Sequence, residues 1–321
     1  MSKKESAFCL GFRSFIRSNK IHSIRKHKML YFMLLPALAF IVIFSYVPMF
    51  GIIVAFQDFI LTDGVFGSEM VGFKVFREIL FSPASASYLA FRNTIYISLI
   101  RILTNFPIIL IYALLINEIN NKKFRGIVQS ISYIPFFISW ISVGGMSYNL
   151  FAVDEGLLNK LLALFGKEPI TWYAEPKYWW GILTISSLWK GMGWSTLIYL
   201  SSIGSIDAEL YDACTIDGGG RFRQMVSVTL PGIMNVIMLQ LILDLGCIMS
   251  DNYDQIMAMI NSSQSLNSTT EVVGSLEYDA IVNGSQYSKA TAYALIRGII
   301  GLSLVLLANN IAKKTDNEGV L

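Results

Sequence analysis

The chain has 321 residues, of which 54% are hydrophobic and only 15% are charged, with a formal net charge of +3. Soluble domains carry about 25% charged residues, so this composition excludes a disordered chain, a nucleic-acid binder built on a basic surface and a soluble globular enzyme. It predicts instead an all-α membrane protein with one polytopic transmembrane unit.

Residues 1–28 form a basic segment ahead of the first long apolar run. Its cations are Lys3, Lys4, Arg13, Arg17, Lys20, Arg25, Lys26 and Lys28. Phe8, Phe12, Phe15 and Ile16 share one helical face, which suits a cytoplasmic amphipathic helix on the inner leaflet. An unstructured tail that only sets the topology explains the charges equally well, and in both interpretations the tail is retained.

Six apolar segments follow, each near the length of about 20 residues that a membrane-spanning helix needs. They are 29–55, 87–117, 126–150, 179–201, 232–253 and 289–312. The sequence therefore predicts a six-helix transmembrane domain over 29–312, followed by a short cytoplasmic tail at 313–321.

Lysine and arginine are concentrated in the N-terminal tail, in segments 118–125 and 202–231, and at Lys313 and Lys314. Because positive charge is retained on the cytoplasmic side, both termini are predicted to be cytoplasmic. The remaining connections lie outside, and the Asn-, Ser- and Thr-rich residues 261–270 are expected to form a mobile outer loop.

The cytoplasmic loop 206–231 is long and patterned. Asp207 can cap a helix, and Gly218, Gly219 and Gly220 can end it with a sharp turn. A second short helix then runs to Pro231, which opens the fifth span. The loop is predicted to form a compact helix–turn–helix knob that faces the cytosol.

This loop resembles the EAA loop of ABC importer permeases, in which Glu-Ala-Ala, two residues and Asp-Gly-Ala precede a Leu-Pro. The corresponding residues are Asp212-Ala213-Cys214, Thr215-Ile216, Asp217-Gly218-Gly219 and Leu230-Pro231. Asp212, Cys214 and Gly219 depart from that pattern, but the spacing is intact.

Four other stretches resemble the maltose-type family of carbohydrate-uptake permeases, especially those for polysaccharide-derived oligosaccharides with a lipoprotein binding partner. They are YVPMFGIIVAFQDF (46–59), Asn93-Thr94, SYIPFFISW (132–140) and Trp189–Trp194 with Gly191 and Gly193.

The resemblance implies a type I importer permease bundle in a bacterial cytoplasmic membrane. It implies a homologous second permease, two cytosolic ATPase subunits, an extracytoplasmic binding protein, an oligosaccharide substrate and surrounding membrane lipids, but no nucleic acid. The ATPase would contact Leu210, Asp212, Ala213, Ile216, Asp217 and Gly218. No G-x-x-x-x-G-K-[ST] motif occurs, so ATP and magnesium are assigned to the partners, and this chain is expected to hold no cofactor or metal and to have no catalytic residue.

Three charged residues fall near the middle of predicted spans, where a charge costs about 2.5–3.5 kcal/mol on insertion scales. They are Arg101, Lys190 and Asp244. Asp244 either pairs with one of the two cations or lines a sugar path. A polar stripe on one helix is also expected, formed by Gln240, Asp244, Cys247, Asp251 and Gln255.

A sugar path needs hydrogen-bonding groups for hydroxyls and aromatic faces for pyranose rings. The candidates are Trp140, Tyr148, Trp194, Asp244, Asp251, Asn252 and Tyr253. Packing and internal neutralisation are the alternative roles for these side chains.

Two other functions fit less well. A self-sufficient secondary transporter or channel would need inverted repeats and broken helices at matched positions, and no such halves are evident. A membrane-embedded phosphotransferase is suggested by Asp217-Gly218 and Arg221, but the arginine is one residue early and the second acid pair is missing.

Overall fold

The computed structural model describes residues 28–82, 86–250 and 253–314. Within these ranges the chain is almost entirely helical, and its strands are a single antiparallel pair, β1 (Gln57–Asp58) with β2 (Glu69–Met70). The predictions for residues 1–27, for Asp251 and Asn252 and for 315–321 lie outside the described residues.

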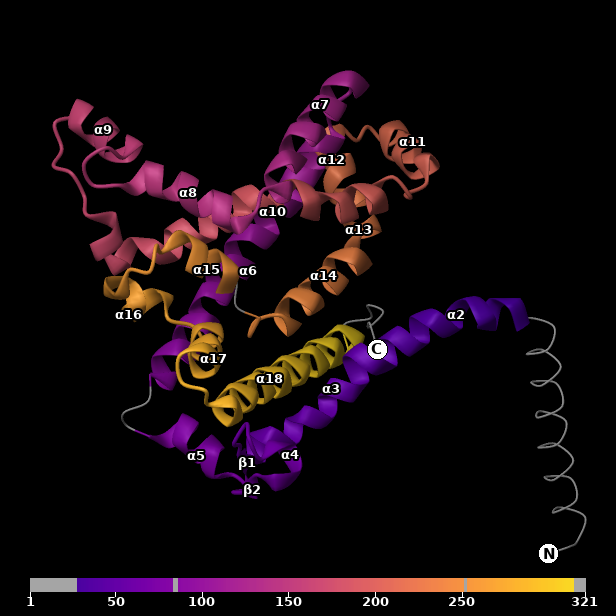
Figure 1. Cartoon of the computed structure of the whole chain (residues 1–321). Coiled ribbons are helices and arrows are strands. Elements are labelled where there is room, and N and C mark those ends of the chain that lie inside the picture. Colours follow the sequence, from indigo (N-terminus) through magenta and orange to yellow (C-terminus); the bar gives the residue numbers. More distant parts are fainter. Residues whose placement is uncertain (1–27, 83–85, 251–252, 315–321) are drawn as a thin grey trace, which may run out of the picture.

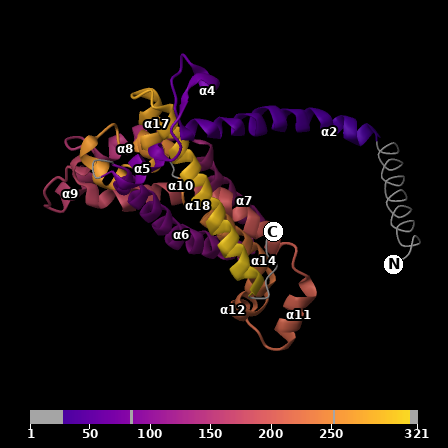
Figure 2. The same cartoon turned by 90° about the horizontal axis from the view of Figure 1, so that it is seen from below.

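The chain begins with a 29-residue apolar rod, Lys28–Phe56, whose side chains are mostly exposed. It combines α2 (Lys28–Ile41), a π-helical segment (Val42–Tyr46), α3 (Val47–Met49) and a 3-10 segment (Phe50–Phe56). Pro48 lacks a backbone N–H, which accounts for the change from α to π and 3-10 geometry around it. Figures 1 and 2 show the N-terminal half of this rod projecting away from the other helices.

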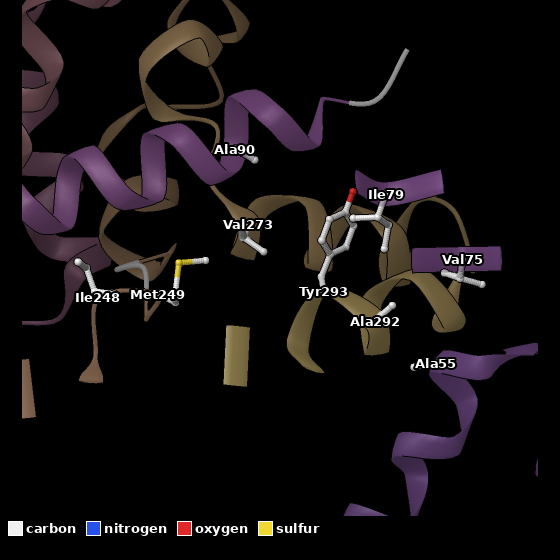
Figure 3. Close-up of a cluster of buried hydrophobic side chains, with 9 residues drawn as sticks. All are labelled: Ala55, Val75, Ile79, Ala90, Ile248, Met249, Val273, Ala292 and Tyr293. Atoms are coloured by element: carbon white, nitrogen blue, oxygen red, sulfur yellow. The ribbon is translucent and has the colours of Figure 1, made fainter. Parts of the chain in front are cut away.

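The C-terminal end of the rod is tied to the helical body by a small hydrophobic core. The hairpin, α4 (Gly64–Gly67) and α5 (Lys74–Phe81) follow the rod. Figure 3 shows the buried cluster formed by Ala55, Val75, Ile79, Ala90, Ile248, Met249, Val273, Ala292 and Tyr293. These side chains come from the rod, α5, α6 (Ser87–Asn117), α17 (Val273–Val282) and α18 (Tyr287–Lys314) and from the turn after α14 (Met234–Gly246), so the cluster joins both ends of the chain.

Helix α6 packs along α10 (Trp179–Ile203), and α14 packs on α18. A methyl group at Gly301 would lie 2.9 Å from the Gly246 carbonyl, so glycine permits the close approach of α14 and α18. The outer segments contain α9 (Leu157–Leu164), η4 (Trp172–Ala174) and η5 (Pro176–Tyr178).

Three of the expected spans are single helices long and apolar enough to cross a membrane: Lys28–Phe56, Ser87–Asn117 and Tyr287–Lys314. Two more are bent pairs. Lys122–Phe137 meets Trp140–Phe151 at 96°, and Arg221–Gly232 meets Met234–Gly246 at 61°. The first pair contains α7 (Lys122–Tyr133), η3 (Ile134–Phe137) and α8 (Trp140–Phe151); the second contains α12 (Arg221–Gln224), η6 (Met225–Thr229), α13 (Leu230–Gly232) and α14. Helix α10 fills the expected fourth span but does not meet that test of apolarity, because Lys190, glycines and serines interrupt its apolar sequence.

The expected continuous fifth span at 232–253 is wrong. Helix α14 ends at Gly246, a turn follows, and a separate helix, α15 (Tyr253–Met259), packs on α8. Gln240 and Asp244 therefore do not share a helix with Gln255, and the predicted polar stripe does not exist as one face. The backbone turns because the Ile248 and Ser250 N–H groups donate to carbonyls three residues back.

The segment 261–270, expected to be a mobile outer loop, contains two short helical turns. It forms η7 (Gln264–Leu266) and α16 (Asn267–Thr270), with Leu266 and Thr270 buried. It joins α15 to α17, and both of these helices line the second cavity described below.

Candidate functional site

The loop 206–231 forms the predicted knob, and Figures 1 and 2 show its first helix, α11 (Ala208–Ile216), at the end of the molecule away from α17. The Asp207 carboxylate accepts the Glu209 N–H at 3.0 Å and caps α11. At the other end, Gly218 has φ +78°, its N–H donates to the Thr215 carbonyl, and the Gly219 N–H donates to the Cys214 carbonyl. This is a Schellman ending, which needs a left-handed residue at Gly218.

Side chains hold the two arms of the knob together. The Tyr211 and Thr229 hydroxyls lie 3.0 Å apart, and the Gln224 amide donates to the Thr215 hydroxyl at 2.8 Å. Where the knob meets α14, Ile206 packs over Gly232. The knob is therefore a preformed unit.

The six predicted ATPase contacts are all exposed on this knob. Leu210 and Ile216 expose 55% and 86% of their surface, and residues 206–220 contain four acids but no lysine or arginine. Phe222, which lies beyond the turn in α12, is also 74% exposed. The sequence pattern did not single out Phe222, although an aromatic residue between Arg221 and Arg223 in a loop predicted to be cytosolic is a usable signal. The face combines apolar and acidic contacts, which suits a protein partner.

Lys190 does not pair with Asp244. Its ammonium group donates to the carbonyls of Phe136 at 2.7 Å and Ile138 at 2.5 Å, with the Pro135 carbonyl at 3.4 Å. These carbonyls lie at the break between η3 and α8, where the backbone turns, and the Pro135 carbonyl also accepts the Ile138 N–H at 3.2 Å. A cation at the carboxyl end of a helix is also electrostatically favoured.

The stretches 132–140 and 189–194 form one contact. The Trp194 and Phe136 rings are stacked, with their centres 4.5 Å apart and their planes 5° from parallel. A side chain at Gly193 would collide with the Ser132 carbonyl. The Lys190 ammonium also lies 5.4 Å from the Trp140 ring centre. Trp194, a predicted path residue, thus contacts the helix break and is 47% exposed; its role in the sugar path stays a prediction.

Arg101 and Asp244 line the same cavity of about 320 Å³ between α6, α10 and α14. We call it the central cavity. Gln240 donates to the Asp244 carboxylate at 3.1 Å, and Asn105, Tyr199 and several serines complete a polar lining. Of the three charged residues predicted near mid-span, Arg101 and Asp244 therefore lie at one cavity, and Lys190 lies elsewhere.

A second cavity, of about 420 Å³, lies between α8, α15, α17 and α18. We call it the outer cavity. Its lining includes Trp140, Tyr253, Asp254, Glu277, Tyr278 and Arg297. Arg297 donates to Glu277 at 2.9 Å, and the Tyr253 and Tyr278 rings lie 5.5 Å apart. Aromatic faces beside paired charges and amides are the chemistry that binds hydroxylated pyranose rings.

The predicted path residues separate in the structure. Trp140 and Tyr253 meet in the outer cavity, and Asp244 lies in the central cavity. Tyr148 packs against Tyr173, with ring centres 6.2 Å apart. Glu277 and Tyr278 were missed because α17 lies 20 residues or more from Tyr253 along the chain. Arg297 did carry a signal, since an arginine inside an apolar span is costly.

Just before α17, burial raises the pKa of Glu271, and Asp279 raises that pKa further. Among the described residues, no three histidine, cysteine or acidic side chains are grouped to hold a metal ion.

The profile of the family described as "Binding-protein-dependent transport system inner membrane component" matches residues 98–317. The polygalacturonan/rhamnogalacturonan transport system permease protein YteP of Bacillus subtilis is 36% identical, over 96% of this chain and 95% of its own length. Protein LplB of the same organism is 34% identical, over 93% of this chain and 92% of its own length.

Among solved structures, the chain matches one chain of a bacterial alginate ABC transporter in complex with an alginate pentasaccharide-bound periplasmic protein. The TM-score is 0.83 at 30% identity, covering 93% of this chain and 99% of the other. The fold is therefore that of a type I ABC importer permease, as the resemblance implied.

Proposed function

The chain belongs to the family of binding-protein-dependent transport system inner membrane components, and from this premise we propose that it is a permease subunit of an ATP-driven importer of oligosaccharides. The observation that carries this proposal is the α11 knob, which is capped at both ends and presents apolar and acidic residues outward. We propose that the knob docks on a cytosolic ATPase and couples its closure to movement of the bundle.

The proposed topology has six spans with both termini in the cytoplasm of a bacterium. Each of the three single helices is one span, each of the two bent pairs is one span, and α10 is the sixth. Clusters of lysine and arginine near the proposed inner ends of the spans support this orientation.

The proposed partners are a homologous second permease, two ATPase subunits and an extracytoplasmic binding protein. The exposed apolar rod Lys28–Phe56 favours an assembled state in which lipids or another subunit cover it. ATP and magnesium are assigned to the ATPase subunits, and this chain is proposed to be a non-catalytic subunit without a cofactor of its own.

We assign the oligosaccharide path to the outer cavity, with Trp140 as the stacking surface. Replacing Trp140 with alanine is expected to raise the oligosaccharide concentration for half-maximal uptake by about tenfold, since a lost stacking contact of about 1.4 kcal/mol corresponds to that factor. Uptake of labelled oligogalacturonate and of a neutral oligosaccharide by reconstituted liposomes measures it. The matched control is Tyr148→Ala, which removes an aromatic ring packed on Tyr173. Equal effects of the two substitutions would contradict the assignment.

The experiment that tests the function is mass spectrometry of the proteins that co-purify with a tagged chain in mild detergent. A second permease together with an ATPase is the expected result. A homo-oligomer that transports sugar in liposomes without ATP would overturn the proposal in favour of a self-sufficient secondary transporter or channel.

A further inference from the structure

Residues 260–272 connect α15 to α17, and α6 holds this connection from one side. Asn93 is fully buried, and its side-chain amide donates to the Glu271 carbonyl at 2.9 Å and the Ser268 carbonyl at 3.3 Å. Thr94, which is 1% exposed, accepts the Val273 N–H at 3.1 Å. The N–H of Val273, the first residue of α17, is thus bound directly by α6.

Arg92, also on α6, makes further hydrogen bonds to this connection and to Asn93. Its guanidinium donates to the Ser268 carbonyl at 2.6 Å and to the Asn93 side-chain oxygen at 3.0 Å. The bond to Asn93 leaves the amide nitrogen of that side chain directed at the backbone carbonyls. The orientation of the Asn93 amide is therefore determined by its neighbour.

The other side of the connection is held by the α10 end. Trp180 donates to the Thr269 carbonyl at 2.9 Å, and the Thr269 hydroxyl donates to the Pro176 carbonyl at 3.2 Å. Leu266 is the one fully buried large apolar side chain among the described residues 261–270. Ile260 and Val272 at its two ends are also buried, so apolar packing and these polar contacts together determine where this segment lies.

These contacts act on the outer cavity without touching it. Tyr253 and Asp254 on α15 and Glu277 and Tyr278 on α17 line that cavity, whereas Asn93 and Thr94 do not. The spacing between the two helices depends on the segment that joins them. We propose that Asn93 and Thr94 are positioning residues for the oligosaccharide path, anchoring the outer wall of the cavity to α6. This inference rests on the proposed import function.

The test uses substitutions that change one group each, in the assembled importer. Asn93→Asp keeps the acceptor for Arg92 but replaces the donor with an oxygen that faces carbonyls. Thr94→Val keeps the shape but removes the acceptor for Val273, and Thr94→Ser is the conservative control because it retains the hydroxyl. Hydrogen–deuterium exchange of peptides covering 263–275 reports the anchor, and uptake with ATP hydrolysis reports its consequence.

Exchange over 263–275 is expected to accelerate about tenfold in Asn93→Asp and Thr94→Val and to stay near the original rate in Thr94→Ser, with α18 unchanged. The oligosaccharide concentration for half-maximal uptake should rise about fivefold in the first two variants, while ATP hydrolysis without substrate changes less than about twofold. Unchanged exchange, or faster exchange with unaltered uptake, would overturn the inference. Failure of the unsubstituted complex to import any oligosaccharide with ATP would instead count against the proposed function.

Discussion

Replacing Gly218 with valine is expected to abolish substrate-stimulated ATP hydrolysis and uptake. Gly218 has φ +78°, a conformation that costs a β-branched residue about 1–3 kcal/mol. The chain can escape that cost only by abandoning the Schellman turn, which would displace Ile216 and Asp217 on the proposed docking face. The measurement is ATP hydrolysis by the reconstituted importer with and without the loaded binding protein, together with the amount of ATPase that co-purifies.

The same loop provides a matched control for Gly218→Val. Gly220 has an ordinary φ of −77°, and a side chain at either glycine would meet open space. Gly220→Val therefore adds the same bulk without the backbone strain and should retain more than about half of the stimulated activity. If both variants behaved alike, bulk on the surface and not the left-handed turn would explain the loss. Full activity of Gly218→Val would contradict the docking role of the loop.

Replacing Lys190 with methionine is expected to destabilise the chain strongly. The substitution preserves most of the side chain but leaves the carbonyls of Phe136 and Ile138 without this donor at the proposed fourth span. Each unpaired carbonyl costs about 1–3 kcal/mol, so Tm in detergent should fall by at least about 5 °C. Lys190→Arg should lower Tm by less than Lys190→Met, because arginine keeps the positive charge and the N–H donors. The control is Lys177→Met, at an exposed ion pair with Glu175 in the outer segment, which should change Tm by less than about 1 °C.

The role of Lys190 can be separated from charge pairing with Asp244 by a double-mutant cycle. Because Lys190 contacts backbone carbonyls and Asp244 lies in the central cavity, the effects of Lys190→Met and Asp244→Asn should add to within about 0.5 kcal/mol. Suppression of the Lys190→Met defect by Asp244→Asn would show that the two charges do compensate each other. The carbonyl assignment would then be wrong.

The structure also changes how three residues singled out in the sequence are interpreted. Asn93, Thr94 and Gly193 sit in stretches that resemble carbohydrate permeases, and the sequence offers no physical role for them. In the fold, Asn93 and Thr94 bind the backbone near α17, and Gly193 admits α7 against α10. Each acts through a neighbour that lies far away along the chain, so no local pattern could have revealed the contact.

The sequence by itself determined the membrane class, the location of the apolar segments and the knob. Apolar runs are a property of composition, and the caps at Asp207 and Gly218 depend on hydrogen bonds that reach at most five residues along the chain. Only the tertiary structure decided the break after Gly246, the partner of Lys190 and the walls of the outer cavity. Lys190 reaches a carbonyl 54 residues away, and Asn93 reaches one 178 residues away. Which donor satisfies a buried carbonyl depends on how the helices cross, and that arrangement is a property of the packed chain as a whole.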